Sequence, residues 1–272
     1  MRSRKTSRSL RLWQLLILAG LFAFWYVATS PTLLPPIYFD NPDKAAFFFG
    51  EPLKVLERVW IWFSSGSIYE HLWVTLLETV LAFIIGTVSG LGVGLWLALS
   101  PTAAALFDPY IKAVNSMPRV ILAPIFGVWF GLGMASKVAL GITLVFFIVF
   151  FNVYQGVREV SHTVLANARM LGASDRQLLR NVYIPSAMSW VFASLHNSVG
   201  LAFVGAVVGE YLGSSEGVGY LILQAEGTFD VNSVFAGILV LTAFALVLDW
   251  MVTLAERRLM VWQPRSGETE RI

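Results

Sequence analysis

The segment ANARMLGASDRQLLRNVYIP, residues 166–185, is polar and arginine-rich within a chain that is otherwise strongly apolar. Apolar residues here and just before it recur at helical spacing in two runs: Val164, Leu165, Ala168 and Leu171, then Leu178, Leu179 and Val182. Gly172 is a typical helix stop, and Ser174 with Gln177 fits a capping box that begins a second helix. The segment therefore predicts two short helices joined by a glycine turn, with Pro185 beginning the next helix. Ordinary loops seldom have two capped amphipathic helices, so we expect this one to dock another protein.

The composition of the whole chain is that of an integral membrane protein. Of its 272 residues, 57% are hydrophobic and only 13% are charged. The net charge of +2 and the scattered basic residues argue against a nucleic-acid partner. The chain has no cysteine, which excludes disulfides, thiolate metal sites and cysteine nucleophiles.

Long apolar stretches predict an all-α, polytopic membrane protein with six transmembrane helices. Each stretch is near or above the roughly 20 residues that cross a bilayer. They cover residues 12–29, 72–99, 109–130, 138–155, 186–212 and 231–255. Arginine and lysine gather before the first stretch, after the fourth and after the last. Because basic residues favour the cytoplasmic side, both termini and the 157–185 segment are expected there.

Two patterns indicate how these helices pack. Glycines recur four residues apart in the second, third and fifth stretches, where they let neighbouring helix backbones approach closely: Gly86, Gly90 and Gly94; Gly127 and Gly131; Gly205, Gly209 and Gly213. Pro118 and Pro124 are expected to kink or break the third stretch.

Residues 51–63, between the first two stretches, predict an amphipathic helix. Leu53, Leu56, Val59, Trp60 and Phe63 share one side of it. Pro52 would stand in its first turn. The helix would lie on the outer membrane surface or pack against the protein without lipid contact, and the sequence leaves both possibilities open.

Polar residues inside the stretches are candidates for a translocation pathway. Glu78, Glu210 and Asp249 need an explanation because acids are costly in lipid. For Glu210 a pathway position and a hydrogen bond between helices are equally good explanations. The other pathway candidates are Asn115, Met117, Arg119, His196 and Asn197, of which His196 fits packing inside the bundle better.

The 166–185 segment resembles the cytoplasmic EAA loop of binding-protein-dependent ABC importer permeases. Its matching positions are Ala168, Gly172, Val182, Ile184 and Pro185, whereas Ala166 stands where the glutamate is usual and Asn167 where the first alanine is. The resemblance extends from about residue 70 to 262, through DPYIKAVNSMPRVILAPIFGVWFGLG, SKVAL, VGEYLGSSEGVGYLI and AERRLMVW. It is strongest to the aliphatic sulfonate, taurine and nitrate permeases.

This resemblance implies a type I ABC importer permease fold in the bacterial inner membrane. It implies a homodimer, two ATPase subunits that bind ATP and Mg, an external binding protein and a small anionic substrate. The residues expected to couple to the ATPase are Leu165, Ala168, Leu171, Gly172, Ala173, Ser174, Gln177, Leu178 and Pro185. The expected divisions are 1–69, with the first transmembrane and interfacial helices; 70–255, the permease core with its 157–185 coupling loop; and 256–272, a cytoplasmic tail.

The chain has no phosphate-binding loop of the G-x-x-x-x-G-K-[ST] type, so ATP must be hydrolysed by a partner, and no cofactor is expected on this chain. Two rival functions remain. Residues 213–217 match the G-x-S-x-G motif of serine hydrolases, although that motif needs a strand before it. An ion-driven secondary transporter would use the buried acids as ion sites, but would leave the capped loop without a role.

Overall fold

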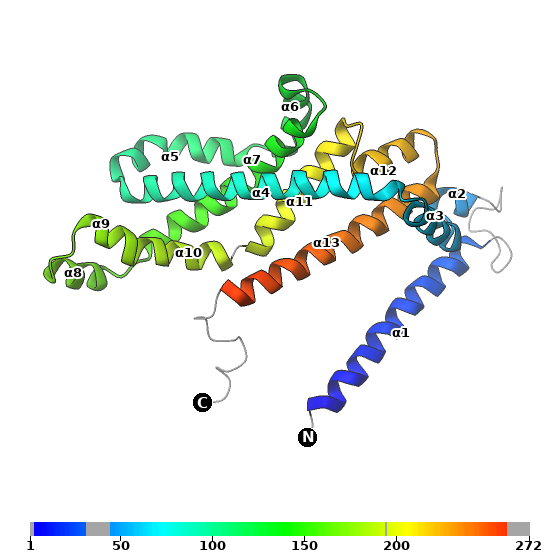
Figure 1. Cartoon of the computed structure of the whole chain (residues 1–272), viewed down its shortest axis with the longest axis horizontal. Coiled ribbons are helices and arrows are strands. Elements are labelled where there is room, and N and C mark those ends of the chain that lie inside the picture. Colours follow the sequence, from blue (N-terminus) through cyan, green and yellow to red (C-terminus); the bar gives the residue numbers. More distant parts are fainter. Residues whose placement is uncertain (1–2, 31–43, 194, 260–272) are drawn as a thin grey trace. The chain divides into compact units, whose positions relative to one another are not determined.

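The computed structural model describes residues 3–30, 44–193 and 195–259, and every regular element in them is a helix (Figure 1). The longer helices are α1 (Ser3–Thr29), α4 (Ser67–Leu99), α5 (Pro101–Ser116), α7 (Met134–Arg158), α11 (Leu195–Leu212) and α13 (Val231–Leu259). The shorter elements are α2 (Lys44–Phe49), α3 (Pro52–Ser65), η1 (Arg119–Ile121), α6 (Leu122–Phe130), α8 (His162–Met170), α9 (Asp175–Leu178), η2 (Leu179–Tyr183), α10 (Ile184–Ala193) and α12 (Val218–Gly227). Most of the predicted 256–272 tail lies outside the described residues.

The chain forms two compact units, which are described separately. The smaller unit comprises residues 1–69 and 221–241, and the larger comprises residues 70–220 and 242–272. The predicted domain division at 69/70 and 255/256 stays a prediction.

Helix α7 is the centre of the larger unit. Its buried valines lie along one face and pack with residues of α4, α10 and α11. A Cβ added to Gly86 of α4 would lie 2.7 Å from the Cβ of Val145, and one added to Gly205 of α11 would lie 2.5 Å from the Cα of Gly141. The predicted close packing through glycines is confirmed here, because these contacts leave no room for side chains. Gly127 and Gly131 differ from the prediction: a Cβ at Gly127 would meet only Leu132 at 3.6 Å, and Gly131 ends α6 with a φ of 77° and has nothing within 4 Å.

The predicted third stretch is two helices rather than one straight span. Helix α5 begins at Pro101, eight residues before the expected start, and ends at Ser116; the axes of the two halves meet at 78°. Pro118 stands at the break, as expected for a residue that lacks a backbone N–H and restricts its neighbour. No residue of α5 is buried.

The number of spans differs from the predicted six. Within the described chain, four segments are long and apolar enough to cross a membrane, Leu12–Thr29, Ser67–Leu99, Met134–Arg158 and Val231–Leu254, and the bent α5–α6 pair would make a fifth. The predicted 186–212 span corresponds to most of α10 and all of α11, which lie on either side of residue 194, outside the described residues. The chain is an all-helical membrane protein, and a total of six spans is not confirmed.

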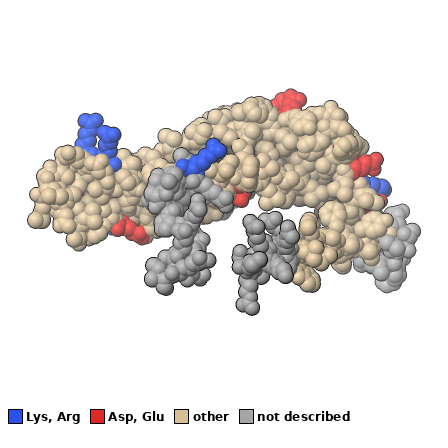
Figure 2. Space-filling model, turned by 60° about the horizontal axis from the view of Figure 1, so that its bottom comes forward, with Lys and Arg blue, Asp and Glu red and all other residues tan. Residues whose placement is uncertain are grey.

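On the face that Figure 2 shows, charged side chains form small separate groups among other residues.

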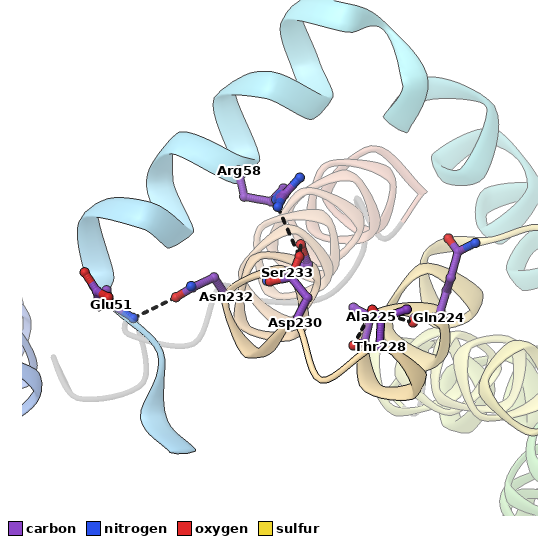
Figure 3. Close-up of polar contacts among 8 residues, drawn as sticks. All are labelled: Glu51, Arg58, Gln224, Ala225, Thr228, Asp230, Asn232 and Ser233. Carbon is purple, nitrogen blue, oxygen red and sulfur yellow. Dashed lines mark hydrogen bonds and ion pairs between the residues drawn. The ribbon is translucent and has the colours of Figure 1, made fainter. Parts of the chain in front are cut away.

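In the smaller unit, polar contacts hold α3 to the start of α13 (Figure 3). Arg58 Nη2 lies 3.1 Å from Asp230 Oδ2, and the Glu51 N–H donates to Asn232 Oδ1 at 2.7 Å. Asp230 also caps α13 by accepting from the Ser233 N–H and hydroxyl. Burial raises the pKa of Asp230, but the Ser233 hydrogen bonds and the Arg58 charge outweigh it, so this pKa lies below its ordinary value.

Helix α3 begins at Pro52 as predicted and has two different apolar faces. Val55 is fully buried and holds the helix to its own unit. Leu53, Leu56 and Trp60 lie on another face and are 63%, 47% and 72% exposed. The helix therefore packs on the protein while leaving most of the predicted apolar side uncovered.

Candidate functional site

The residues singled out at 157–185 form a helical hairpin, residues 162–178. Helix α8 ends at Met170, and Gly172 follows with a φ of 80°, a left-handed conformation that favours glycine. The Ala173 N–H donates to the Ala168 carbonyl at 3.0 Å and the Gly172 N–H to the Arg169 carbonyl at 2.9 Å. These bonds satisfy carbonyls at the helix end, so the predicted glycine stop is confirmed.

The predicted capping box begins the second helix of the hairpin. The Ser174 N–H donates to Gln177 Oε1 at 2.8 Å, and the Gln177 N–H donates to Ser174 Oγ at 3.4 Å. Each residue thus satisfies a backbone donor at the start of α9. The hydrogen bonds described at the turn between α8 and α9 join residues at most five positions apart.

Replacing Ser174 with alanine is expected to loosen α9 by about 1 kcal/mol, the usual contribution of an N-cap side chain. Hydrogen exchange at the amides of residues 175–178 should then be roughly 5-fold faster. Ser161→Ala is the matched control, since Ser161 stands at the N-cap of α8 without a side-chain capping bond. Equal exchange in the two variants would show that the box does not stabilise the hairpin.

The helix that starts at Asp175 does not stop at Pro185, contrary to the prediction. It continues through a π-turn, η2, into α10, and the Ile184 N–H donates to the carbonyl of Leu179, five residues earlier. An α-helical turn would bring the proline ring against the carbonyl of residue 181, and the wider turn relieves that clash. The hairpin is therefore continuous with a predicted membrane segment.

The nine predicted coupling residues have different positions in the hairpin. Leu171 is 89% exposed at its tip, next to Met170 at 85%, which the sequence did not single out. Leu178 is 2% exposed and anchors the base. Leu165, Ala168 and Ala173 are half-buried, whereas Gly172, Ser174, Gln177 and Pro185 are exposed. The tip is thus an uncovered apolar surface on a base that is anchored by the buried Leu178.

Helix α10, which follows the hairpin and η2, contacts α7. Ser186 Oγ donates to the Gly156 carbonyl at 2.8 Å. A Cβ at Gly156 would lie 2.5 Å from Cδ1 of Trp190, so the indole packs directly on the α7 backbone. Movement of the hairpin would therefore reach both α7 and α10.

The structure brings some of the pathway candidates together. Arg119 donates to the carbonyl and side-chain oxygens of Asn115, and its guanidinium carbon lies 4.5 Å from the centre of the Phe147 ring of α7. Met117, 40% exposed, lies at the break between α5 and α6. This group braces the bend.

The other pathway candidates have partners or positions of their own. His196 Nε2 lies 3.1 Å from Thr253 Oγ1 of α13 and 3.8 Å from an Asp249 oxygen, which supports packing within the bundle. It lines a small cavity of about 50 Å³ with Asp249 and Phe203. The neighbouring Asn197 is exposed.

Glu210 is fully buried, with both carboxylate oxygens bonded to this chain. It accepts from Thr75 Oγ1 at 2.6 Å and from the Gly219 N–H at 2.7 Å. Lys137, near the start of α7, is 1% exposed. This geometry supports the hydrogen-bond explanation for Glu210. The sequence missed Thr75 and Lys137 because neither has a distinguishing local pattern.

The hydrolase motif at 213–217 lacks its structural context. It follows helix α11, and the described residues contain no strand that could lead into it. The Gly217 N–H donates to His71 Nδ1 at 3.1 Å, so this imidazole nitrogen accepts a hydrogen bond from the backbone of the motif.

Comparison with protein families decides among the possible functions. The family model described as "Binding-protein-dependent transport system inner membrane component" matches residues 90–261, more than half of the chain. The chain belongs to this family. It is the permease subunit of a binding-protein-dependent ABC importer and a multi-pass inner membrane protein, and it is not itself catalytic. Such a system implies ATPase and binding-protein partners, so the secondary transporter and hydrolase alternatives fall away.

Individual relatives agree with this assignment. The permease is 30% identical over 249 residues to the putative aliphatic sulfonates transport permease protein SsuC of Bacillus subtilis (strain 168), covering 92% of this chain and 87% of the relative. It is 28% identical over 250 residues to the taurine transport system permease protein TauC of Escherichia coli (strain K12), covering 90% and 87%.

The fold of the permease is similar to that of a solved ABC transporter. A chain of the MetNI methionine ABC transporter, solved in inward-facing conformations, superposes with a TM-score of 0.58 at 19% identity, covering 70% of this chain and 92% of that chain. At this identity the likeness supports the fold alone.

Proposed function

We propose that the α8–α9 hairpin is the surface through which an ATPase subunit drives this permease. The supporting observation is the tip, where Met170 and Leu171 are 85% and 89% exposed although both are large and apolar. Large apolar side chains on a rigid, capped turn are suited to a pocket on a protein partner. Arg169 and Arg176 flank the tip and would favour acidic groups around that pocket.

In this mechanism the hairpin transmits movement of the ATPase subunits to the helices α10 and α7. When the two ATPase subunits close on ATP and Mg, they move the bound tip with them. The contacts between the tip and the ATPase must then differ between the open and closed states, because a ligand shifts an equilibrium only through such differences. Leu178 is buried and α9 continues through η2 into α10, so the movement passes along one helix. The contacts of Ser186 and Trp190 with Gly156 then carry it to α7.

We propose a homodimer whose two copies enclose the pathway. No residue of α5 is buried, and exposed apolar side chains such as Phe107, Tyr110 and Val114 are suited to helix or lipid neighbours. Each copy would span the membrane six times, and α10 and α11 together would form the fifth span along the chain. Both termini would lie in the cytoplasm, as the basic residues favour. Asn115, Met117 and Arg119 at the bend and Asn197 on α11 remain the proposed pathway residues.

The proposed substrate is a small anion such as a sulfonate, taurine or nitrate. This rests on the sulfonate and taurine permeases among the relatives. Arg119, at the bend, is the cation among the proposed pathway residues and would complement a negative charge.

We also infer that α3 lies at the outer membrane surface with its uncovered apolar face in lipid. Its buried face, through Val55, already binds the protein, and Leu53, Leu56 and Trp60 face away from that contact. One residue, Gly66, separates α3 from α4, a helix long enough to span the membrane, which supports a position of α3 near the bilayer boundary. Tryptophan favours that depth.

Single cysteines can test this topology, because the native chain has none. With a membrane-impermeant maleimide, cysteine at Leu171 or Arg258 should react only in inverted vesicles, and cysteine at Glu57 should react in intact cells. Cysteine at Trp60 should react much more slowly than at Glu57, since lipid would cover it. Labelling of position 171 in intact cells would contradict the coupling role, and equal rates at 57 and 60 would contradict the lipid contact.

A further inference from the structure

A buried polar cluster connects α4, α7, α11 and the start of α12 within the larger unit. Thr75, Glu78, Lys137 and Glu210 are each 1% exposed or less. Charged groups are rarely enclosed inside membrane helices unless something compensates them. The permease assignment does not account for this cluster.

Glu210 is the hydrogen-bond acceptor at its centre. Its two oxygens accept from Thr75 Oγ1 and from the Gly219 N–H, and the Val218 N–H donates to Thr75 Oγ1 at 3.2 Å. Gly217 has a φ of 98°, and a Cβ there would overlap the Glu210 carboxyl group. The turn at 217–219 is therefore packed directly on this carboxylate.

Glu78 lies one turn after Thr75 on the same face of α4, so its carboxyl group approaches the Glu210 carboxyl group to which Thr75 donates. None of the described donors bonds to Glu78, and its Oε2 is buried without a partner among the described residues. An ionised carboxylate can only accept hydrogen bonds, so two ionised groups cannot bond to each other. Placed together out of water, they would also repel.

The charges around the pair balance only if one proton is present. Lys137 is a buried cation whose charge acts on both acids; its ammonium group donates to the carbonyls of Leu132 and Gly133, and its side chain packs on Gly209. Two carboxylates and one ammonium leave a net negative charge, which one proton neutralises. His71 of α4 and Glu216 of the 213–217 turn are the other titratable groups nearby.

We propose that Glu78 and Glu210 form a site that binds one proton at neutral pH and thereby fastens the 217–219 turn to α4 and α11. Glu210 already receives hydrogen bonds on both oxygens, so it is the ionised partner. Glu78 carries the proton and donates it to Glu210. A carboxylate committed in this way positions the turn and is not a ligand for the transported substrate.

Infrared spectroscopy of the full-length permease can detect this proton directly. At neutral pH the protein should show the carbonyl stretching band of a protonated carboxylic acid. The band should shift when only glutamate is labelled with carbon-13, which distinguishes it from aspartic acid without any mutation. Absence of the band at neutral pH, or a band that the label does not shift, would overturn the proposal.

Variants then assign the proton to Glu78. Glu78→Gln should lose the band yet stay folded, because the amide N–H can replace the donated hydrogen bond. Glu70→Gln is the matched control, an exposed glutamate two turns earlier in α4, and it should keep the band. Glu210→Gln places an amide NH2 group against the donors that now bond to the carboxylate. It should therefore speed hydrogen exchange at residues 217–219. Glu78→Gln should leave that exchange unchanged. A band that persists unchanged in Glu78→Gln would refute the assignment.

Discussion

The Met170→Asp/Leu171→Asp double variant is expected to lose ATP-dependent uptake and to fail to retain the ATPase during purification. Both side chains project from the hairpin tip, where they are 85% and 89% exposed. Burying one large apolar side chain in a partner contributes about 1.5–3 kcal/mol. Removing two, and placing carboxylates in an apolar pocket, should weaken binding more than about 100-fold. The measurements are uptake in reconstituted vesicles and co-purification of the ATPase.

The fold of the permease itself should not change in this variant, because neither side chain packs on its own chain. Its thermal unfolding in detergent should therefore match that of the native protein. The control is the exchanged pair, Met170→Leu with Leu171→Met, which keeps the apolar area and should keep uptake. Normal ATPase retention by the aspartate variant would show that the tip is not the docking surface.

Gly205→Leu is expected to prevent α7 and α11 from packing and to have a large effect on folding. The Cβ alone would lie 2.5 Å from the Cα and 2.9 Å from the backbone nitrogen of Gly141. Backbone atoms cannot move aside as a flexible side chain can, so the helices would have to separate. Overpacking of this kind typically costs about 1–3 kcal/mol, and the backbone collision places it at or above the upper end.

Size-exclusion chromatography and thermal unfolding in detergent would measure this effect. Gly200→Leu provides a close control, since it lies on the same helix and a Cβ there would meet nothing within 4 Å. We expect the Gly200 variant to remain monodisperse while the Gly205 variant aggregates or unfolds at a clearly lower temperature. If both behave like the native protein, the close approach of α7 and α11 is not required.

The hairpin could be predicted from sequence because its stabilising contacts are local. The turn at Gly172 is closed by hydrogen bonds between residues three to five positions apart, and Ser174 and Gln177 are three residues apart. Such contacts are specified by spacing alone. The π-turn before Pro185 could not be predicted, since a proline ends some helices and is accommodated in others.

Membrane spans and helix packing faces could also be predicted in part, because they too depend on residues that are close in sequence. An apolar run long enough for a bilayer is a property of consecutive residues, and glycines four apart share one helix face. The sequence did not show that α5 and α6 meet at 78°, because Pro118 permits a bend without setting its angle. It also left α3 between two alternatives; the structure shows one face of this helix buried and another uncovered, and its contact with lipid stays a proposal.

The apolar helical spans and the capped, glycine-turned hairpin could be predicted from the sequence, because those features depend on neighbours within one or two helical turns. The burial of Glu78, Lys137 and Glu210 in one cluster became visible only in the folded chain, since they come from three helices far apart in the sequence. A buried charge is tolerated only with partners close in space, and nothing in the spacing of residues 78, 137 and 210 reveals that they meet.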